Sequence, residues 1–568
     1  MIFKGQMATL CWIGIAVASA HAENPPLELS PEHQGAVNRT RRIIYHHDSA
    51  ANVNWDVKGV GPERIDDVVK YIVSPLDAQP NQIDSVWYDW GEGNQAIWPS
   101  KILPVHPNNP YADWRKAGKD LVRLVMEAAQ QRGKEVFYSY RINGGDHDFG
   151  LKIPLLKKEH PEWTHDAYNG LGYRMKHIFW NFAVPEVRDY KVKIIRELAE
   201  DYDFDGISLD FARNPNLFIV GTQWENRDHL TMFMRDVRAM TLEVEKARGR
   251  PLLLAARVPE NIPGCNFDGI DIQQWTREQL VDILVLGGRS SEVDISEMRR
   301  ITAGTGIKLY PCFDFVHTSD SYDHPSIEQA RGVYANWWYQ GADGVYAFNN
   351  LYMEPGTAQS VGAPRDKNGW HNQCQLFREL GSPDTLEGKD KVFFIQRRGY
   401  MDGHIIPKPE DWWTPRHQFS YINMQAALPT TLSKNNRVDR LLTITVADDV
   451  NALGEQVESV TLHLGLHDPA AKDLPETERN EGVSGVRRHR PPPPLYTAKG
   501  IEKQVEVRMN NLLLDSARME EGWLVFPVKP KQLALGDNLV GVRMTERTPP
   551  NAPEISIEKL EVRVKYLK

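Results

Sequence analysis

Cysteine is scarce in this sequence. The 568 residues include 4 cysteines, and Cys11 lies within the first 22 residues. Cys265, Cys312 and Cys374 are scattered through the rest of the chain, with no pair at a metal-ligand spacing. Three such cysteines build neither a disulfide framework nor a zinc site, and at most one pair can close. A small fold held together by cysteines is therefore excluded.

An excess of positive charge is also missing. The formal net charge is -9 at pH 7, which argues against general nucleic-acid binding. Two glycine patterns are missing as well: no G-x-G-x-x-G turn follows the first predicted strand, and no G-x-S-x-G elbow is present. The first absence disfavours a dinucleotide-binding fold, and the second disfavours a Ser-His-Asp hydrolase. We expect no cofactor.

Long apolar runs are confined to the N-terminus. Met1–Ala22 has the form of a secretory signal peptide, with Lys4 at its start, an apolar stretch over Leu10–Ala18 and small residues before the cleavage point. No later segment has the length and apolarity of a membrane span. We therefore expect a secreted or periplasmic protein that is cleaved after Ala22 and is not inserted in a membrane. The sequence does not fix the oligomeric state.

Strand-like and helix-like segments alternate eight times between Arg41 and Leu380. Eight such repeats over this length predict a (β/α)₈ barrel, with an open doubly wound sheet as the alternative. We place the barrel at residues 41–388 and a mobile lead-in at residues 23–40. The predicted strands are 41–49, 82–91, 135–141, 203–215, 252–258, 281–286, 307–315 and 344–349.

The pattern changes near Lys389. About seven short alternating runs with turn signals between them predict an antiparallel β-sandwich over residues 389–568. Such a module either binds carbohydrate or only buttresses the barrel. Earlier in the chain, the stretch from Ile142 to about Phe182 is too long for a plain connection, and we interpret it as a functional loop.

Charged side chains stand where the predicted strands end. Asp210 follows the buried apolar run of the fourth strand. Burial of a carboxylate there costs folding free energy unless the group has a charged partner or a function in the site. The plain alternative is that Asp210 only pairs with Arg213. In a barrel the carboxyl ends of the strands build the site. The side chains at these ends are His46, His47, Asp48, Asp89, Trp90, Arg141, Asn143, Asp146, His147, Asp148, Asp210, Arg213, Arg257, Glu260, Arg289, Asp314, His317, Asn349, Asn350 and Glu354.

Two carboxylates facing each other across the mouth are the minimum for glycoside hydrolysis. Asp210 and Glu260 are the predicted pair, because they follow neighbouring strands and Pro259 fixes the turn before Glu260. The alternative for Glu260 is an exposed loop residue, and Asp314 is the rival partner. The predicted substrate contacts are Asp89, Trp90, Arg141, Asn143, His147, Asp148, Arg213, Arg257, Arg289, Asp314 and Asn349.

Four arginines follow four consecutive strands: Arg141, Arg213, Arg257 and Arg289. They either neutralise the carboxylates or bind an anionic sugar, for which the guanidinium fork is suited. The 16 Trp and 20 Tyr favour sugar stacking or fill the cores. The runs around His46 and His147 contain metal-ligand types without a recognised metal spacing, so we expect no catalytic metal.

The fourth-strand segment D-F-D-G-I-S-L-D-F-A-R-N-P, residues 203–215, resembles the corresponding motif of glycosyl-hydrolase-like family 10 barrels. Asn181–Arg188 resembles the same group. So does the third-strand cluster of Arg141, Asn143, Asp146 and His147, although Gly144 and Gly145 are inserted in it here. Secreted enzymes that cut sulfated fucans share this outline. The resemblance covers about residues 41–380.

This resemblance implies Asp210 as nucleophile, Glu260 as acid/base, a retaining mechanism and a sulfated, fucan-like polysaccharide. A second hypothesis from a different class is a secreted carbohydrate-binding protein on a barrel scaffold without catalysis, because fold alone does not decide function. The replacements Asp210→Asn and Glu260→Gln discriminate the two if they abolish turnover and leave glycan binding intact.

Overall fold

The structure is a computed structural model of the chain. The predicted signal peptide lies outside the residues that it describes. Those residues are 27–48, 61–77, 80–90, 93–106, 111–144, 154–168, 174–288, 290–314, 322, 325–348, 374–398, 425–432, 438–483, 494–545 and 553–568.

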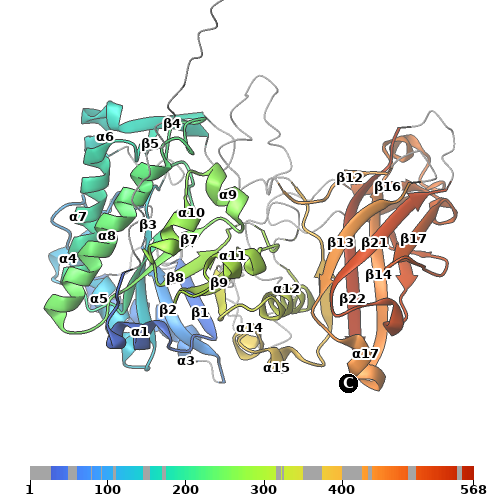
Figure 1. The fold of residues 1–568 in the computed structure, drawn as a ribbon, viewed down its shortest axis with the longest axis horizontal. Coiled ribbons are helices and arrows are strands. Elements are labelled where there is room, and N and C mark those ends of the chain that lie inside the picture. The colour runs from blue at the N-terminus through green and yellow to red at the C-terminus, as the bar shows by residue number, and fades with distance from the viewer. Residues whose placement is uncertain are drawn as a thin grey trace, which may run out of the picture.

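Eight parallel strands close into a barrel, which confirms the predicted (β/α)₈ fold (Figure 1). Their order around the barrel is β1-β10-β9-β8-β7-β6-β3-β2. Aliphatic and aromatic residues dominate these strands, which suits segments that are buried on both faces. The strands are β1 (Ile43–Asp48), β2 (Ile83–Asp89), β3 (Glu135–Arg141), β6 (Gly206–Asp210), β7 (Leu253–Val258), β8 (Ile283–Leu286), β9 (Lys308–Asp314) and β10 (Val345–Phe348).

Alternate residues of these strands fill the barrel interior. Ile44, Trp87, Phe137, Val285 and Tyr346 belong to one buried cluster, separate from the apolar layer between the strands and the helices. The rings of Trp87 and Phe137 stack with their centroids 4.5 Å apart. Side chains on a strand point inward at every second residue, so this cluster fixes which later positions also face inward.

Helices surround the barrel. The segment over residues 111–131 forms two helices, because Gly118 adopts a φ of +70° and Asp120 caps a new helix through the Arg123 N–H. The helices are α3 (Ile65–Asp77), α4 (Tyr111–Lys116), α5 (Leu121–Gln130), α7 (Pro185–Asp201), α8 (Arg227–Arg248), α9 (Ile262–Phe267), α10 (Ile272–Arg277), α11 (Ile295–Ile301), α12 (Ile327–Tyr339), α14 (Cys374–Glu379) and α15 (Pro383–Leu386). Within the described ranges, none has the length and apolarity to cross a membrane.

The expected lead-in contains a helix, α1 (Pro31–Val37), that packs on the barrel. Arg41 is fully buried, donates from Nε and Nη2 to the Glu135 carboxylate at 2.6 Å, and donates to the backbone oxygens of Val37 and Ala36. His33 lies 2.6 Å from Glu245 and 2.9 Å from Asp282. These contacts close the end of the barrel opposite to the carboxyl ends of the strands, so this segment is not a mobile lead-in.

The expected functional loop after β3 carries its own antiparallel hairpin. It consists of β4 (Thr164–Tyr168) and β5 (Arg174–Trp180), preceded by the short helix α6 (Leu155–Glu159). The Trp180 N–H donates to Asn143 Oδ1 at 2.8 Å, which ties the hairpin to the end of β3. Sequence reasoning missed these strands.

The C-terminal part has two packed antiparallel sheets, as predicted for a β-sandwich (Figure 1). The first sheet has the order β11-β22-β14-β20-β19, with β12 also on β22; the second has the order β13-β21-β17-β18. A separate hairpin, β15-β16, completes this part. The strands are β11 (Lys391–Phe394), β12 (Thr430–Thr431), β13 (Arg440–Val446), β14 (Val457–His467), β15 (Arg479–Val483), β16 (Pro494–Ala498), β17 (Val505–Met509), β18 (Leu512–Leu513), β19 (Arg518–Glu520), β20 (Trp523–Pro527), β21 (Gly536–Met544) and β22 (Ser556–Tyr566), and α17 (Val450–Leu453) precedes β14.

Helix α12 joins the barrel to the sandwich (Figure 1). Its Gly332 lies so close to β11 that an added Cβ would fall within 3.0 Å of the Val392 carbonyl oxygen. Asn336 Nδ2, one turn further along the helix, donates to the Thr445 carbonyl at 2.9 Å. The sandwich therefore packs directly against the barrel.

Candidate active site

Charged side chains line the inside of the barrel just above its apolar filling. Steps of two residues from the buried cluster along β2, β3, β7 and β9 lead to four of them, β6 supplies the fifth, and each is no more than 3% exposed. In barrel order, positive and negative groups alternate over β2, β3, β6 and β7, and β9 adds one more carboxylate. These groups, which we name the mouth ring, are Asp89, Arg141, Asp210, Arg257 and Asp314.

Asp210 ends β6 inside this ring. One carboxylate oxygen, Oδ1, accepts the backbone N–H groups of Ala212 at 3.1 Å and Arg213 at 2.9 Å. The other, Oδ2, accepts from Arg257 Nη1 at 2.9 Å. All three contacts are donors, so they complement an ionised carboxylate at a position that is 1% exposed. Asp210 does pair with an arginine, but its side-chain partner is Arg257, whereas Arg213 contributes its backbone N–H.

Arg257 ends the inward-facing row of β7 and joins two carboxylates. Burial lowers the pKa of its guanidinium, but the charges of Asp210 and, more weakly, Asp314 raise that pKa above its ordinary value. Its Nε donates to the Gly287 carbonyl at 3.1 Å, and its guanidinium carbon lies 4.2 Å from the centre of the Phe348 ring. The Arg257 guanidinium is therefore held at the mouth by the Asp210 carboxylate, the Gly287 carbonyl and the Phe348 ring.

Asp89 and Arg141 form the second pair of the ring. Arg141 Nε lies 2.7 Å from Asp89 Oδ2, and His46 Nε2 lies 3.9 Å from the same oxygen. The His46 ring stacks on Phe348 with the centroids 4.3 Å apart. Both pairs of the ring are thus buried ion pairs in which each charge is compensated.

Glu260 lies beyond the ring, two residues after β7, and is 1% exposed. Its backbone oxygen accepts the Asp294 N–H at 3.0 Å. A Cβ added to Gly287 would lie 3.6 Å from the Cβ of Glu260, and one added to Gly288 would lie 3.4 Å from Arg257 Nη2. Gly287 therefore lies next to Glu260 and Gly288 next to the Arg257 guanidinium, and Glu260 is not an exposed loop residue.

The other predicted contacts divide into four groups. Trp90 is buried in the layer between strands and helices, so the structure does not bring it into the ring. Asn143 uses its side-chain amide on backbone groups, donating to the Trp180 and Asn216 oxygens and accepting the Trp180 N–H. Arg213 is half-buried beside Asp210. The remaining predicted positions, His147, Asp148, Arg289 and Asn349, lie outside the described residues.

Sequence reasoning missed helix α9 and the buried Asp268 that follows it. Asn261 caps this helix through the Gly264 N–H at 2.8 Å, and a proline stands in its first turn. This cap-and-proline signal is readable in the sequence. Asp268 is 1% exposed, and burial, together with the charge of Glu260, raises the pKa of its carboxyl well above the usual range.

Metal ligands do not gather anywhere in the described part of the chain: no group of three or more His, Cys, Asp or Glu side chains is placed to hold an ion. Cys265 and Cys312 are both buried as free thiols.

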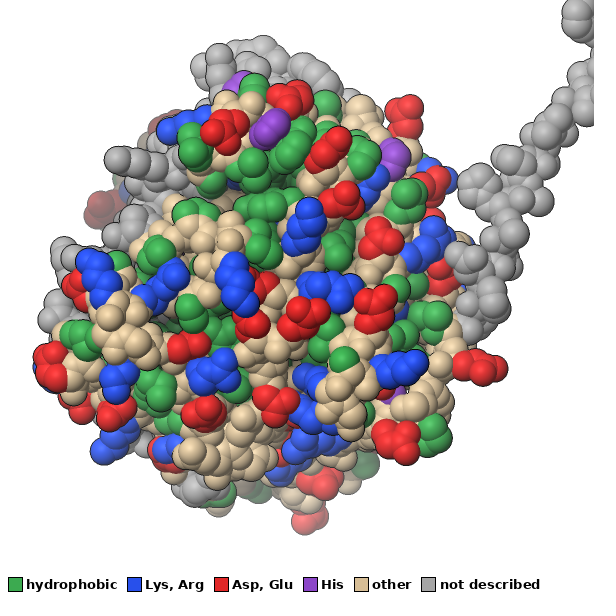
Figure 2. Space-filling model, turned by 90° about the vertical axis from the view of Figure 1, so that its left-hand side faces the viewer, with side chains coloured by type: hydrophobic (Ala, Val, Ile, Leu, Met, Phe, Trp, Pro, Cys, Tyr) green, Lys and Arg blue, Asp and Glu red, His purple; other side chains and the backbone are tan. Residues whose placement is uncertain are grey.

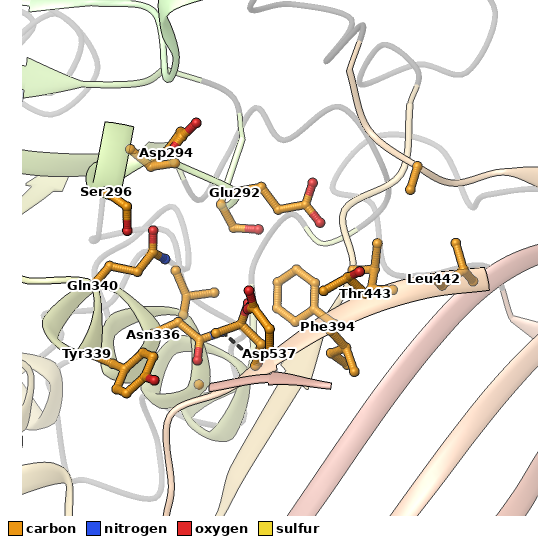
Figure 3. A pocket seen from close by; sticks show the side chains of 18 of the residues that line it. Glu292, Asp294, Ser296, Asn336, Tyr339, Gln340, Phe394, Leu442, Thr443 and Asp537 are labelled. Atoms are coloured by element: carbon orange, nitrogen blue, oxygen red, sulfur yellow. Dashed lines mark hydrogen bonds between the residues drawn. The ribbon is translucent and has the colours of Figure 1, made fainter. Parts of the chain in front are cut away.

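A cleft of about 950 Å³ lies between the barrel and the sandwich (Figure 3). Three carboxylates line it, and each has a structural bond: Glu292 accepts the Gln396 N–H, Asp294 caps α11, and Asp537 accepts the Thr445 hydroxyl at 2.6 Å. Tyr339 and Phe394 add aromatic surface (Figure 3). The wall includes Asn261, so the cleft reaches the segment that carries Glu260.

The outer face of the barrel shown in Figure 2 carries acidic and basic side chains interspersed. Between α7 and α8, Arg196 of α7 pairs with Glu200 of the same helix and with Glu243 of α8. Because acidic and basic side chains alternate on this face, it offers no continuous positively charged surface for an anionic polymer.

A comparison with known protein families matches the part of the barrel that carries Asp89, Arg141 and Asp210. A model of the family described as Glycosyl hydrolase-like 10 matches residues 53–225. This match spans β2, β3 and β6 and includes Asp89, Arg141 and Asp210. It confirms the predicted resemblance at the level of this group and supports a carbohydrate-active barrel. The fucan-cutting branch stays a prediction.

Two curated relatives share part of the chain. "Glycosyl hydrolase YngK" of Bacillus subtilis (strain 168) is 25% identical over 166 residues, which cover 28% of this chain and 31% of that protein. "S-layer-related protein" of Niallia circulans is 26% identical over 197 residues, covering 31% of this chain and 11% of that protein. The matched region thus spans less than a third of either relative.

Among solved structures, an α-amylase from Lactobacillus plantarum aligns with a TM-score of 0.36 and 12% identity, covering 87% of this chain and all of that one. A β-L-arabinopyranosidase from Geobacillus stearothermophilus aligns with a TM-score of 0.35 and 10% identity, covering 92% of this chain and all of that one.

Proposed function

We propose that this protein is a secreted glycoside hydrolase that cleaves an anionic, fucan-like polysaccharide with two carboxylates. One observation carries the proposal: Asp210 stands at the mouth of the barrel, at the end of the matched strand, with three donors that complement its charge. A charged, oriented carboxylate at this place is what a glycosidase nucleophile requires.

In the proposed reaction, an oxygen of Asp210 attacks the anomeric carbon. The bond from that carbon to the leaving oxygen breaks, and the leaving oxygen takes a proton from Glu260. Water then attacks the anomeric carbon and gives its proton to Glu260, and the bond from that carbon to Asp210 breaks, which restores the original anomeric configuration. Arg257, itself held by the Gly287 carbonyl, orients the Asp210 carboxylate before the attack and receives it again when the ester is cleaved.

Asp314 is the second candidate for the partner of Asp210, and a specific observation favours it. It belongs to the mouth ring, and its charge acts on the same Arg257 as that of Asp210. Glu260 is preferred as the acid because it follows β7, the strand next to that of Asp210, and is buried at the same end of the barrel.

The anionic substrate in this proposal follows from the resemblance to enzymes that cut sulfated fucans. Arg141 and Arg257 are each paired with a ring carboxylate. We assign substrate sulfate or carboxylate groups to Arg213 and Arg289, the other two predicted arginines.

Reducing-end release by the purified mature protein tests the proposal. The panel is fucoidan as sulfated fucan, alginate as uronic polymer and laminarin as neutral glucan. We expect release from fucoidan, its loss in Asp210→Asn and Glu260→Gln, and near-normal rates in the control Asp228→Asn, whose side chain is 60% exposed on α8. Full activity in Glu260→Gln with loss in Asp314→Asn would transfer the acid role to Asp314. Binding without release by the wild type would favour the non-catalytic alternative.

Secretion is tested separately. The intact mass of the exported protein is expected to correspond to a chain that begins at Glu23, after cleavage behind Ala22. Retention of residues 1–22 in the mature protein would refute this part of the proposal.

A further inference from the structure

Trp224 stands apart from the other tryptophans of the described ranges, most of which are buried in the cores. It is 44% exposed, and no other described tryptophan is exposed to this extent. It lies in the loop that leads from Asp210, at the end of β6, to the start of α8. A single apolar side chain at the surface is common, so the surroundings of Trp224 decide whether it belongs to a site.

Hydrogen bonds fix the loop that carries this ring. The Thr222 hydroxyl donates to the Ile219 oxygen at 2.8 Å, and the Thr222 oxygen accepts from the Asn226 side-chain amide at 2.8 Å. Two apolar side chains, Ile219 at 52% and Trp224 at 44%, are thus held in solvent by an ordered turn. A ligand that binds to such a preorganised surface loses little binding free energy to ordering of the loop.

The loop lies on the rim of the mouth. Its Leu217 oxygen accepts the Phe182 N–H at 2.9 Å, just after the β4–β5 hairpin. Further along, the Gln223 oxygen lies so close to the turn behind α9 that a Cβ added to Gly269 would fall within 3.0 Å of it. The hairpin and α9 stand at the same end of the barrel in Figure 1. A glycan that leaves the mouth over β6 therefore passes along this loop.

Arg227, the first residue of α8, supports the Trp224 ring. Its guanidinium carbon lies 4.7 Å from the ring centre, and its Nη1 donates to the Trp224 oxygen at 2.8 Å. Its Nε lies 3.8 Å from Asp271 and 3.9 Å from Asp228, both beyond hydrogen-bond distance. The guanidinium therefore covers one face of the indole and keeps N–H groups that can donate to a ligand on the ring.

We propose that Trp224 and Arg227 form a sugar-binding subsite for a unit of the substrate chain outside the mouth. The C–H face of a pyranose ring packs on the indole, and an oxygen of the same sugar unit accepts from the Arg227 guanidinium. This inference rests on the proposed function, because it takes the ligand to be the polysaccharide that the barrel cleaves. Neither residue touches the reacting atoms, so the subsite contributes binding along the chain and no step of the chemistry.

Affinity electrophoresis in fucoidan, alginate and laminarin tests the subsite without turnover. We expect at least one polysaccharide to retard the wild type, and Trp224→Ala to bind it about two- to tenfold more weakly, because the stacking contact is lost. Trp224→Phe keeps a ring and should keep most of the affinity. Equal retardation of Trp224→Ala and the wild type would overturn the inference, and so would a wild type that none of the three polymers retards.

Two further variants sharpen this test. Met232→Ala is the matched control, because Met232 is also 44% exposed but lies further along α8, and it should bind like the wild type. Arg227→Gln removes the guanidinium from the ring and should weaken binding in the same direction as Trp224→Ala. Unchanged affinity in Arg227→Gln would contradict the role given to Arg227.

Kinetics on the same polymer distinguish failure of the subsite from failure of the proposed function. Trp224→Ala should raise KM by the factor found for binding and leave kcat within about twofold, because the ring holds the chain away from the bond that breaks. If the wild type binds through Trp224 but releases no reducing ends, the proposed hydrolase function fails. If the wild type cleaves the polymer and Trp224→Ala matches it in both KM and binding, only the subsite fails.

Discussion

Replacing Arg257 with methionine gives the sharpest test of how the mouth is held together. Methionine has a similar length and no charge, so it leaves the Asp210 carboxylate buried with its two backbone donors and no counter-ion. Removing one partner of a buried ion pair costs about 3–5 kcal/mol. Part of this loss also reflects Asp314, whose charge acts on the same guanidinium.

A double-mutant cycle measures the part that belongs to Asp210. Asp210→Asn alone should cost about 1–3 kcal/mol, since it weakens the hydrogen bonds and leaves Arg257 with one fewer counter-charge. The double variant Asp210→Asn/Arg257→Met contains no uncompensated charge at this pair, so its loss should be smaller than the sum of the two single losses by about 2 kcal/mol. Urea unfolding followed by tryptophan fluorescence gives the three values.

Two results would refute this reasoning. A loss below about 1 kcal/mol for Arg257→Met would mean that Asp210 does not depend on this guanidinium. Additive losses in the double variant would mean that the two side chains, although 2.9 Å apart, are not energetically coupled.

Three further predictions concern other parts of the fold. Burial lowers the pKa of His33, but the bonds of His33 to Asp282 and Glu245 outweigh burial and raise this pKa overall. The contribution of His33 to stability is therefore complete below about pH 6.5 and is lost as the pH rises through the folded-state pKa. Urea unfolding at several pH values should show this loss, and His33→Gln should lack it. Gly332→Ala should cost about 1–3 kcal/mol, because the added Cβ meets the Val392 carbonyl. The matched helical control Gly35→Ala has open space around its Cβ and should be neutral or stabilising by up to about 1 kcal/mol. Equal denaturation midpoints for the two variants would contradict the close packing of α12 on β11. Burial raises the pKa of the Cys312 thiol to about 12, so Cys312 and the buried Cys265 should resist alkylation at pH 8 until the protein unfolds; peptide mass spectrometry would detect any labelling of the native protein.

Much of the fold could be predicted from the sequence because it depends on local patterns. The eight barrel strands show regular apolar spacing, and the structure places them within a few residues of the expected bounds, while the alternating runs after Lys389 predicted the sandwich. Asp210 was found for the same reason: a carboxylate interrupts a buried run, and the run ends where barrels build their sites.

The parts that were missed depend on contacts between distant segments. The break between α4 and α5 rests on one glycine turn, and the β4–β5 hairpin is anchored by Asn143, which follows the end of β3. The roles of the arginines could not be predicted either, because strand ends alone do not say that Arg141 and Arg257 each meet a carboxylate of the neighbouring strand. Asp268 was missed because its burial depends on how α9 packs against the end of β7.

The helix that precedes the barrel has a practical consequence for where the catalytic unit begins. The first strand starts at Ile43, yet Arg41 holds Glu135 only while the backbone oxygens of α1 receive its remaining N–H groups, and His33 connects α1 to Asp282 and Glu245. A barrel excised at its first strand would lose Arg41, the partner of Glu135, and His33, one of the partners of Asp282, and this end of the barrel would be uncovered. The smallest piece that keeps this end closed starts before Ser30, the residue that caps α1.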